Sequence, residues 1–410
     1  MATVDRSSKP SFTKSLFLGR LDSELVMPYP VMAADERERV HTLASKAREY
    51  LVSVYDPMKA ERDGWVGDDT IRDLGELGLL GLFVDREYGG QGLSQTGYCR
   101  VMEEFGRVDG TLAVVMGVHQ SIGTKPIYLF GTDEQKARLL PDLASGRKLA
   151  AFALTEPNVG SDAYNLETWA ERQSDGSWLL TGEKRWIGNG TIADVTVVWA
   201  RDVDDKQVKG FLVEKGAEGY QAERMLGKAS LRAVWQARIT LTDVRVAEAM
   251  RLPGGNSFRD TGRVLAGTRY AVAWGALGHA TAAYDIAVAY CMERQQFGKP
   301  LVRFQLVQDK LVKMLAEICS MQLYCLRLAR LQEEGTITDT IAALAKMNNT
   351  RKARQVILEA RDLLGGNGIL LDHHVMRHMA DIEAIHTYEG TETIQTLIVG
   401  RDITGVSAFT

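Results

Sequence analysis

Cysteine and histidine, the residues that most often build zinc sites and redox centres, are scarce in this chain. Of its 410 residues, four are cysteine and seven are histidine. No two cysteines form a Cys-x-x-Cys pair, so the sequence indicates neither a disulfide framework nor a zinc ribbon, and we expect reduced thiols. His374 and His378 lie four residues apart, but only Asp381 is near enough in sequence to serve as a third ligand. We therefore expect no metal site.

Long hydrophobic runs and an excess of one charge are also absent. No segment approaches the ~20 apolar residues of a membrane-spanning helix, and the N-terminus lacks the apolar core of a secretory signal. Forty-nine basic residues face 53 acidic ones, and the net charge is −4 without a run of lysine or arginine. This balance argues against a nucleic-acid-binding protein. Together these properties predict a cytoplasmic protein with no nucleic-acid or membrane partner.

The hydrophobic pattern changes twice along the chain and predicts an α+β fold of three domains. After a polar arm at residues 1–30, which contains several prolines, residues 31–149 show the spacing of amphipathic helices. Residues 150–260 alternate short β-branched runs with turns, which is typical of an antiparallel β-domain. Residues 261–410 form long amphipathic segments that favour a C-terminal four-helix bundle.

Local signals predict several boundaries within these domains. The apolar stretch from Leu112 to about Leu129 predicts one continuous helix. Thr132 and Gln135 have the spacing of a capping box at the start of the next helix. In the β-domain, the pairs Asp175–Gly176 and Asp204–Asp205 predict turns between strands.

A carboxylate near the C-terminus is the strongest candidate for a catalytic group. Glu389 lies between Tyr388 and Gly390, and Thr391 can cap a following helix through its hydroxyl. Partial burial would raise the pKa of such a carboxyl group, whereas the helix N-terminus would stabilise the anion. A base that is desolvated yet ionised suits the abstraction of a weakly acidic C–H proton. The alternative is an ordinary exposed carboxylate in a loop.

Four further motifs could bind a ligand, and each has a plain structural alternative. The loop 154–162 offers hydroxyls and backbone N–H groups to oxygen atoms, or is an interdomain turn. Residues 185–190 contain an indole close to two glycines. They could form a flat surface for a planar ligand, or a hairpin whose tryptophan lies in the core. In residues 294–298, Arg294 at a helix end could bind a phosphate, or the segment could be an ordinary solvated helix end. The glycines of 365–368 could face a pyrophosphate or cap a helix.

In their order, these motifs resemble those of the acyl-CoA dehydrogenase family. The resemblance extends from about residue 30 to the C-terminus, and the pattern is most similar to glutaryl-CoA dehydrogenases and plant short-chain acyl-CoA oxidases. It implies an N-terminal helical domain, a middle β-domain and a C-terminal helical bundle. It also implies non-covalent FAD, a homotetramer, an acyl-CoA substrate from fatty acid or amino acid catabolism, and electron-transfer flavoprotein as the electron acceptor.

The resemblance assigns a role to individual residues. Glu389 matches the base that removes the α-proton of the acyl-CoA while the β-hydride passes to the flavin. The residues that match FAD contacts, some of them to the FAD of a neighbouring subunit, are Phe152, Leu154, Thr155, Ser161, Trp186, Ile187, Gly188, Arg294, Phe297, Phe304, Gln305, Asp362, Leu363, Leu364, Gly365, Gly366, Thr391 and Thr393. Those that match acyl-CoA contacts are Ala113, Ser161, Leu265, Ala266, Arg269, Tyr388 and Gly390.

Two departures from the family pattern bear on substrate and acceptor. Family members commonly have Thr or Ser where this chain has Gly188, whereas the plant oxidases share its Trp-Ile-Gly-Asn order. An acyl-CoA oxidase is therefore the alternative to a dehydrogenase, and a non-catalytic acyl-CoA or flavin-binding scaffold is an alternative of another class. The arginine with which glutaryl-CoA dehydrogenases hold the distal carboxylate corresponds here to Ala113. Because an unpaired carboxylate in an apolar neighbourhood costs several kcal/mol, we expect a neutral acyl chain.

Overall fold

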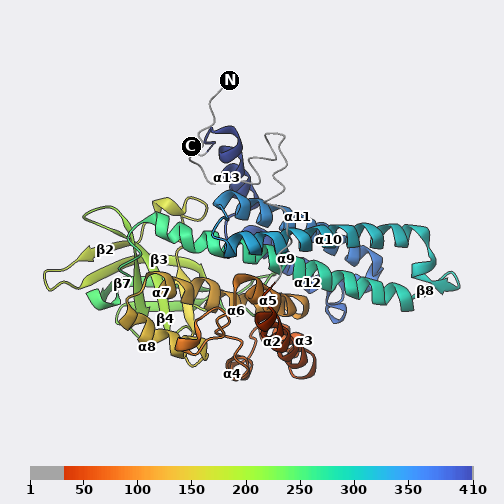
Figure 1. Ribbon diagram of the computed structural model, residues 1–410, viewed down its shortest axis with the longest axis horizontal. Helices are drawn as coiled ribbons and strands as arrows, with labels where there is room; N and C mark the ends of the chain where they lie inside the picture. The colour runs from red at the N-terminus through yellow and green to blue at the C-terminus, as the bar shows by residue number, and fades with distance from the viewer. Residues whose placement is uncertain (1–31, 409–410) are drawn as a thin grey trace.

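The computed structural model describes residues 32–408, apart from the side chains of Tyr270 and Glu333. The predicted arm at residues 1–30 lies outside the described residues. Figure 1 shows a β-sheet region at one end of the molecule, a long helical bundle that extends to the other end, and a layer of N-terminal helices beneath their junction. The expected combination of helical, β and helical regions is confirmed.

The N-terminal region is helical, but its apolar stretch is not one continuous helix. A π-helical turn at Val118–Thr124 separates α6 from α7. Pro126 at the start of α7 has no backbone N–H and cannot extend the ladder of i→i−4 hydrogen bonds into the preceding turn. The predicted capping box at Thr132 and Gln135 is present. The helices are α2 (Ala34–Ser53), α3 (Pro57–Asp63), α4 (Asp68–Glu76), α5 (Gln95–Val108), α6 (Gly110–Gly117), α7 (Lys125–Phe130) and α8 (Asp133–Ala144).

The β-region is one mixed sheet of seven strands in the order β1-β4-β2-β3-β7-β6, with β5 paired to β4. The purely antiparallel prediction is wrong at two pairs, because β1 and β2 each run parallel to β4. Strands joined by the predicted turns do pair antiparallel, whereas parallel partners need longer connections, which turn signals do not reveal. The strands are β1 (Ala150–Ala153), β2 (Trp169–Arg172), β3 (Trp178–Ile187), β4 (Val195–Asp202), β5 (Val208–Glu214), β6 (Tyr220–Arg224) and β7 (Ala237–Val246).

Long helices pack together in the C-terminal region, as the sequence predicted for a helical bundle. A single apolar core runs between α9, α10, α11 and α12 and continues into the N-terminal helices. Buried Asn349 links three of them, since its amide donates to Ala273 O at 3.2 Å and to Cys325 Sγ at 3.1 Å. The elements are α9 (Phe258–Glu293), β8 (Gln295–Gln296), β9 (Lys299–Pro300), α10 (Gln305–Glu333), α11 (Asp339–Leu363), α12 (Val375–Thr387) and α13 (Glu392–Thr404).

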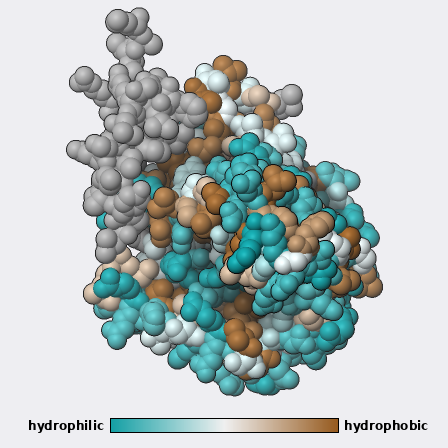
Figure 2. All heavy atoms as spheres, turned by 90° about the vertical axis from the view of Figure 1, so that its right-hand side faces the viewer, coloured by the Kyte–Doolittle hydropathy of each residue, from teal (hydrophilic) through white to brown (hydrophobic). Residues whose placement is uncertain are grey.

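The surface of the bundle is not uniformly polar. Viewed onto the bundle end, hydrophobic residues form patches among hydrophilic ones (Figure 2). Phe297, in the β8–β9 hairpin, is 92% exposed, and Leu306 at the start of α10 is 80% exposed. Over residues 32–408, no helix has both the length and the hydropathy that crossing a bilayer would require.

Candidate active site

The loop between α12 and α13 presents Glu389 in an unusual backbone conformation. Glu389 has φ 56° and Gly390 has φ 87°, so two consecutive residues lie in the left-handed region. A non-glycine residue adopts this conformation only where its surroundings hold it. Thr391 caps α13 as predicted, because its hydroxyl accepts from Ile394 N at 3.3 Å. The backbone conformation of the loop, and not that of α12 or α13, therefore sets the direction of the Glu389 side chain.

Three groups from other helices surround the Glu389 carboxylate. The Thr268 hydroxyl, on α9, donates to Glu389 Oε2 at 3.2 Å. Arg269, also on α9, and Lys346 on α11 supply positive charge nearby. Burial raises the pKa of Glu389, and Arg269, Lys346 and Thr268 act in the opposite direction, with a net upward shift. The desolvated carboxylate expected from the sequence is thus confirmed, but its counter-charges come from α9 and α11.

Side chains from other helices hold several carbonyls of this loop, whereas the N–H groups of Glu389, Gly390 and Thr391 have no acceptor within residues 32–408. Gln395 Nε2 donates to the carbonyl oxygens of Glu389 at 2.9 Å and Gly390 at 3.0 Å. Lys346 Nζ donates to the carbonyls of Tyr388 and Gly390. A ligand oxygen next to the carboxylate could accept a hydrogen bond from the N–H of Glu389.

The end of β1 and the end of β3 meet beside a buried ion pair. Lys184 Nζ contacts Glu156 Oε1 at 2.7 Å and donates to Leu154 O at 3.2 Å. Thr155 O accepts from Arg185 N at 2.8 Å, which places the loop after β1 next to the residue before Trp186. Trp186 has φ 63° and is 50% exposed. The alternative of a core tryptophan is therefore wrong, and the indole forms part of a surface.

The strand end beyond Trp186 packs against the interrupted N-terminal helix. Ile187 is buried, and a Cβ added to Gly188 would lie 2.7 Å from Val118 Cγ2 in the π-helical turn. Asn189 Nδ2 donates to Val115 O on α6 at 2.9 Å. Any residue larger than glycine at position 188 would displace the side chain of Val118.

The predicted substrate residues lie on α6, on α9, in the loop after β1 and in the loop that carries Glu389. Ala113 on α6 and Tyr388 both pack against the same hydrophobic core. Leu265, one turn before Arg269 on α9, packs against the core cluster that contains Phe152 and Leu154. Ala266 lies between these α9 residues and is partly buried, whereas Ser161 is exposed in the loop after β1.

A second group of predicted residues lies elsewhere in the chain. Figure 1 shows the β8 hairpin at the end of the bundle that is furthest from β3, the strand that carries Trp186. The C-terminal end of α11 reaches the same end of the bundle, because Lys310 Nζ contacts Glu359 Oε2 at 2.6 Å. Gly365 has φ 58° and follows Leu364, the C-cap residue of α11, as is typical of a glycine that ends a helix. The structure does not bring this group to Glu389 within one chain: Arg294, Phe297, Phe304, Gln305, Asp362, Leu363, Leu364, Gly365 and Gly366.

Thr391 and Thr393, at the start of α13, lie beside Glu389 and not with that group. Sequence reasoning missed Thr268, Lys346 and Gln395, although all three contact the Glu389 loop. Lys346 did leave a signal, because it stands at a helix position where the apolar pattern of α11 predicts a buried residue.

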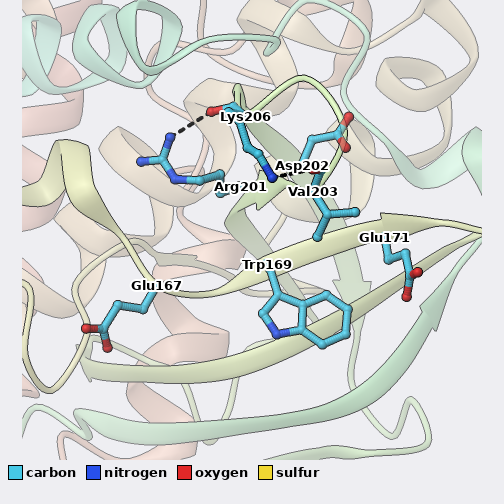
Figure 3. Close-up of a pocket in the computed structure, with 7 residues that line it drawn as sticks. All are labelled: Glu167, Trp169, Glu171, Arg201, Asp202, Val203 and Lys206. Atoms are coloured by element: carbon cyan, nitrogen blue, oxygen red, sulfur yellow. Dashed lines mark hydrogen bonds between the residues drawn. The ribbon is translucent and has the colours of Figure 1, made fainter.

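Two other polar features do not contain any residue predicted for catalysis or cofactor binding. His378 Nδ1 lies 3.0 Å from His279 Nδ1, and the described part of the chain has no group of three or more potential metal ligands. A depression of about 380 Å³ on the β-region is lined by Trp169 and Arg201 among others (Figure 3). Arg201 there donates to Lys206 O at 2.7 Å. None of the residues predicted for catalysis or binding lines this depression.

Comparison with known proteins identifies relatives over the whole described chain. Models of the N-terminal, middle and C-terminal domains of acyl-CoA dehydrogenase match residues 37–147, 151–244 and 258–404. The short-chain-specific acyl-CoA dehydrogenase of Megasphaera elsdenii is 35% identical over 353 residues, which cover 84% of this chain and 92% of that protein.

Two other relatives extend the similarity. The mitochondrial very long-chain-specific acyl-CoA dehydrogenase of Macaca fascicularis is 33% identical over 424 residues, covering 98% of this chain, and the chain spans 65% of that relative's length. The structure of a glutaryl-CoA dehydrogenase from Mycobacterium smegmatis in complex with FADH2 has a TM-score of 0.88 and 32% identity, with 98% of this chain and 100% of that chain covered.

Proposed function

Since the chain belongs to the acyl-CoA dehydrogenase family, we propose that it oxidises an acyl-CoA thioester to the trans-2-enoyl-CoA with FAD as cofactor. The observation that carries this proposal is the environment of Glu389. A partly buried carboxylate with a raised pKa lies beside a backbone N–H that has no acceptor within the described residues. These are the two groups that α-proton abstraction from a thioester requires.

In this proposal Glu389 acts as the base. Thr268 holds one carboxylate oxygen at 3.2 Å and so directs the other toward the substrate. The free N–H of Glu389 donates to the thioester oxygen, which gains negative charge as the α-proton leaves. Arg269 and Lys346 favour the ionised carboxylate before the reaction. Exclusion of water by the bound acyl-CoA then makes the carboxylate a stronger base.

The ends of β1 and β3 offer groups that fit a flavin. The exposed Trp186 offers a flat aromatic surface on which a planar ring could stack. In this proposal Phe152 to Thr155 complete the flavin side of the cofactor site, and Thr391 and Thr393 contact the adenosine-phosphate end. FAD would supply the acceptor for the β-hydride when bound.

The residues at the far end of the bundle fit the same cofactor only through a second copy of the chain. Arg294 and Phe297 are exposed there with the cap glycines 365 and 366. Leu306 is 80% exposed and Val312 is 66% exposed on α10, an apolar surface that association would bury. We propose a homo-oligomer, of the tetrameric kind expected from the resemblance, in which this end completes the FAD site of a neighbouring subunit.

We propose a neutral acyl chain as substrate. Ala113 lies on α6, whose residues Gly110–Gly117 include no charged side chain, and its neighbours Leu112 and Val115 are buried. A distal carboxylate in this apolar surrounding would be unpaired, at a cost of several kcal/mol.

Electron-transfer flavoprotein is the proposed electron acceptor, and an oxidase that reduces O₂ is the second candidate. Gly188 motivates the oxidase, because it removes the hydroxyl group that family members commonly place beside the flavin. Stopped-flow reoxidation of the substrate-reduced protein in air distinguishes the two. Peroxide formation at the rate of turnover would favour the oxidase, whereas slow reoxidation in air with rapid reduction of electron-transfer flavoprotein supports the dehydrogenase.

The role of Glu389 is tested by Glu389→Gln. The variant should retain FAD and acyl-CoA while turnover falls by about 100- to 10,000-fold, the usual contribution of a general base. Glu383→Gln is the matched control, since Glu383 is an exposed carboxylate on α12 that pairs with Arg354. Turnover of Glu389→Gln near that of the control would show that Glu389 is not the base. A purified protein that binds no FAD would instead favour the non-catalytic scaffold.

A further inference from the structure

Lys346 is a buried lysine whose hydrogen-bond partners are all backbone carbonyls. Its side chain is fully buried on α11. Its Nζ donates to His386 O at 3.2 Å and also to the carbonyls of Tyr388 and Gly390. An ammonium group has three protons to donate, so all three are used. No carboxylate of the described residues forms an ion pair with Lys346.

The three carbonyls belong to the end of α12 and to the loop that carries Glu389. His386 lies in the last turn of α12, where backbone carbonyls have no partner within the helix. A cation is favourable at this end because the helix dipole is negative there. The Lys346 ammonium therefore joins the helix end to the loop through a single atom.

The loop cannot adopt its conformation by local preference alone. Glu389 is a non-glycine residue with φ 56°, directly before Gly390 with φ 87°. Lys346 holds the carbonyls of Tyr388 and Gly390 from α11, while Gln395 holds those of Glu389 and Gly390 from α13. The peptide groups on both sides of Glu389 are thus fixed, which determines where its side chain and its N–H point.

We propose that Lys346 is a positioning residue for the proposed base: its ammonium ties the carbonyls around Glu389 to α11 and so fixes the direction of the carboxylate and of the free N–H. This inference rests on the proposed role of Glu389. Lys346 does not touch the substrate in this arrangement and acts through the loop.

The charges around Lys346 give the proposal a second, independent consequence. Burial lowers the pKa of Lys346 to about 7, opposed by Glu389 and Glu392 and reinforced by Arg269. His386, on α12, also faces this ammonium. Lys346 in turn lowers the pKa of Glu389, so removal of its charge should raise that pKa further. This shift reports the charge of Lys346 beside the base, whereas kcat at saturating acyl-CoA reports the position of the carboxylate.

The test compares Lys346→Met, which has neither charge nor donors, with Lys346→Gln, which keeps amide donors without charge. Lys352→Met is the matched control, because Lys352 is on the same helix but pairs with Glu317 of α10, at a half-buried position, and not with the Glu389 loop. Each variant is assayed for FAD content, acyl-CoA binding, and kcat and KM with the same acyl-CoA across pH.

Lys346→Met should keep FAD and acyl-CoA affinity while kcat falls by about 100-fold, the order expected for a misplaced catalytic group. Lys346→Gln should recover part of kcat, because its amide can still hold a carbonyl. In both variants the acid limb of kcat/KM against pH should move to higher pH, and Lys352→Met should match the wild type.

A Lys346→Met protein with bound FAD and a kcat near that of the control would overturn the inference. So would a loss confined to KM, or an acid limb that does not move in Lys346→Gln. If Lys346→Met does not fold, Lys346→Gln decides the question through its kcat at saturating acyl-CoA together with its pH profile. Failure of the proposed base is seen separately, because Glu389→Gln would then remain active.

Discussion

Replacement of Lys184 by methionine should destabilise the protein and release its cofactor. The Lys184 and Glu156 side chains are 0% and 1% exposed, and their charged atoms lie 2.7 Å apart. The ammonium also donates to the carbonyls of Leu154 at 3.2 Å and Trp199 at 2.7 Å. One side chain therefore fixes the loop after β1, which we propose lies against the flavin, to β3 and β4.

The expected magnitude follows from what the substitution leaves behind. Glu156 keeps two backbone donors, the N–H groups of Glu167 and Thr168, but loses its only ion pair within the described residues. Removal of one partner of a buried ion pair costs about 3–5 kcal/mol. Each buried carbonyl left without a donor adds about 1–3 kcal/mol unless water reaches it. We expect a loss of at least about 3 kcal/mol at neutral pH.

The assay is urea denaturation at several pH values, with flavin absorbance per protein as the site readout. Burial raises the pKa of Glu156, and Lys184 and hydrogen bonds outweigh this, so the pKa in the folded protein is lowered. A lowered carboxyl pKa contributes stability above the unfolded pKa, and this stability is lost as pH falls through the folded pKa. Without Lys184 that contribution disappears, so the difference between wild type and variant should shrink toward acid pH.

The control for this prediction is Arg238→Met, which removes the exposed ion pair with Glu183 next to Lys184 on β3. Arg238 Nη2 lies 2.8 Å from Glu183, and the two side chains are 53% and 39% exposed. Such pairs contribute about 0–1 kcal/mol. If Lys184→Met costs no more than Arg238→Met, or if it retains full flavin, the reasoning about the buried pair is refuted.

Three further predictions test the site. Thr268→Val removes the 3.2 Å hydrogen bond to Glu389, which lowers the pKa of that carboxyl; the acid limb of kcat/KM should therefore move to higher pH, and an unchanged limb would contradict this contact. Ala113→Arg places an unpaired cation among buried apolar residues and should lower kcat/KM for neutral acyl-CoAs by about tenfold or more; an unchanged or improved value would show that Ala113 does not line the acyl pocket. Gly188→Thr brings a Cβ to 2.7 Å from Val118 Cγ2 and should destabilise by about 1–3 kcal/mol through overpacking; Val118→Ala in the same chain should restore the urea midpoint, and a Gly188→Thr protein as stable as wild type would disprove the crowding.

Features that depend on neighbouring residues were predictable from the sequence. The cap at Thr391 and the capping box at Thr132 are hydrogen bonds within one helical turn. The antiparallel pairs with short turns follow from turn residues for the same reason. The parallel pairing of β1 with β4 could not be predicted in this way, because Ala150 and Val195 become partners only after the chain between them has folded.

The interruption of the apolar stretch after Gly117 is an intermediate case. Its residues are apolar enough for one helix, although Pro126 indicates that a helix begins or is interrupted near that position. The position of the π-helical turn depends on tertiary contacts, because Gln120 in this turn donates to Leu79 O at 3.1 Å and accepts from Leu82 N at 2.9 Å. These side-chain hydrogen bonds to the segment after α4 compensate for the loss of regular α-helical hydrogen bonding in the turn. The hydrophobic periodicity of the sequence gives no information about such contacts.

The same distinction explains why Glu389 was found and its partners were not. The motif around Glu389 is local, whereas Thr268, Lys346 and Gln395 reach it from α9, α11 and α13. The conformation of the loop therefore depends on how these helices pack. Asn349, one turn after Lys346, ties α11 to α9 and α10 through buried hydrogen bonds. It follows that the geometry of the proposed base is a property of the bundle as a whole, and a substitution in the bundle core can change catalysis without touching the loop.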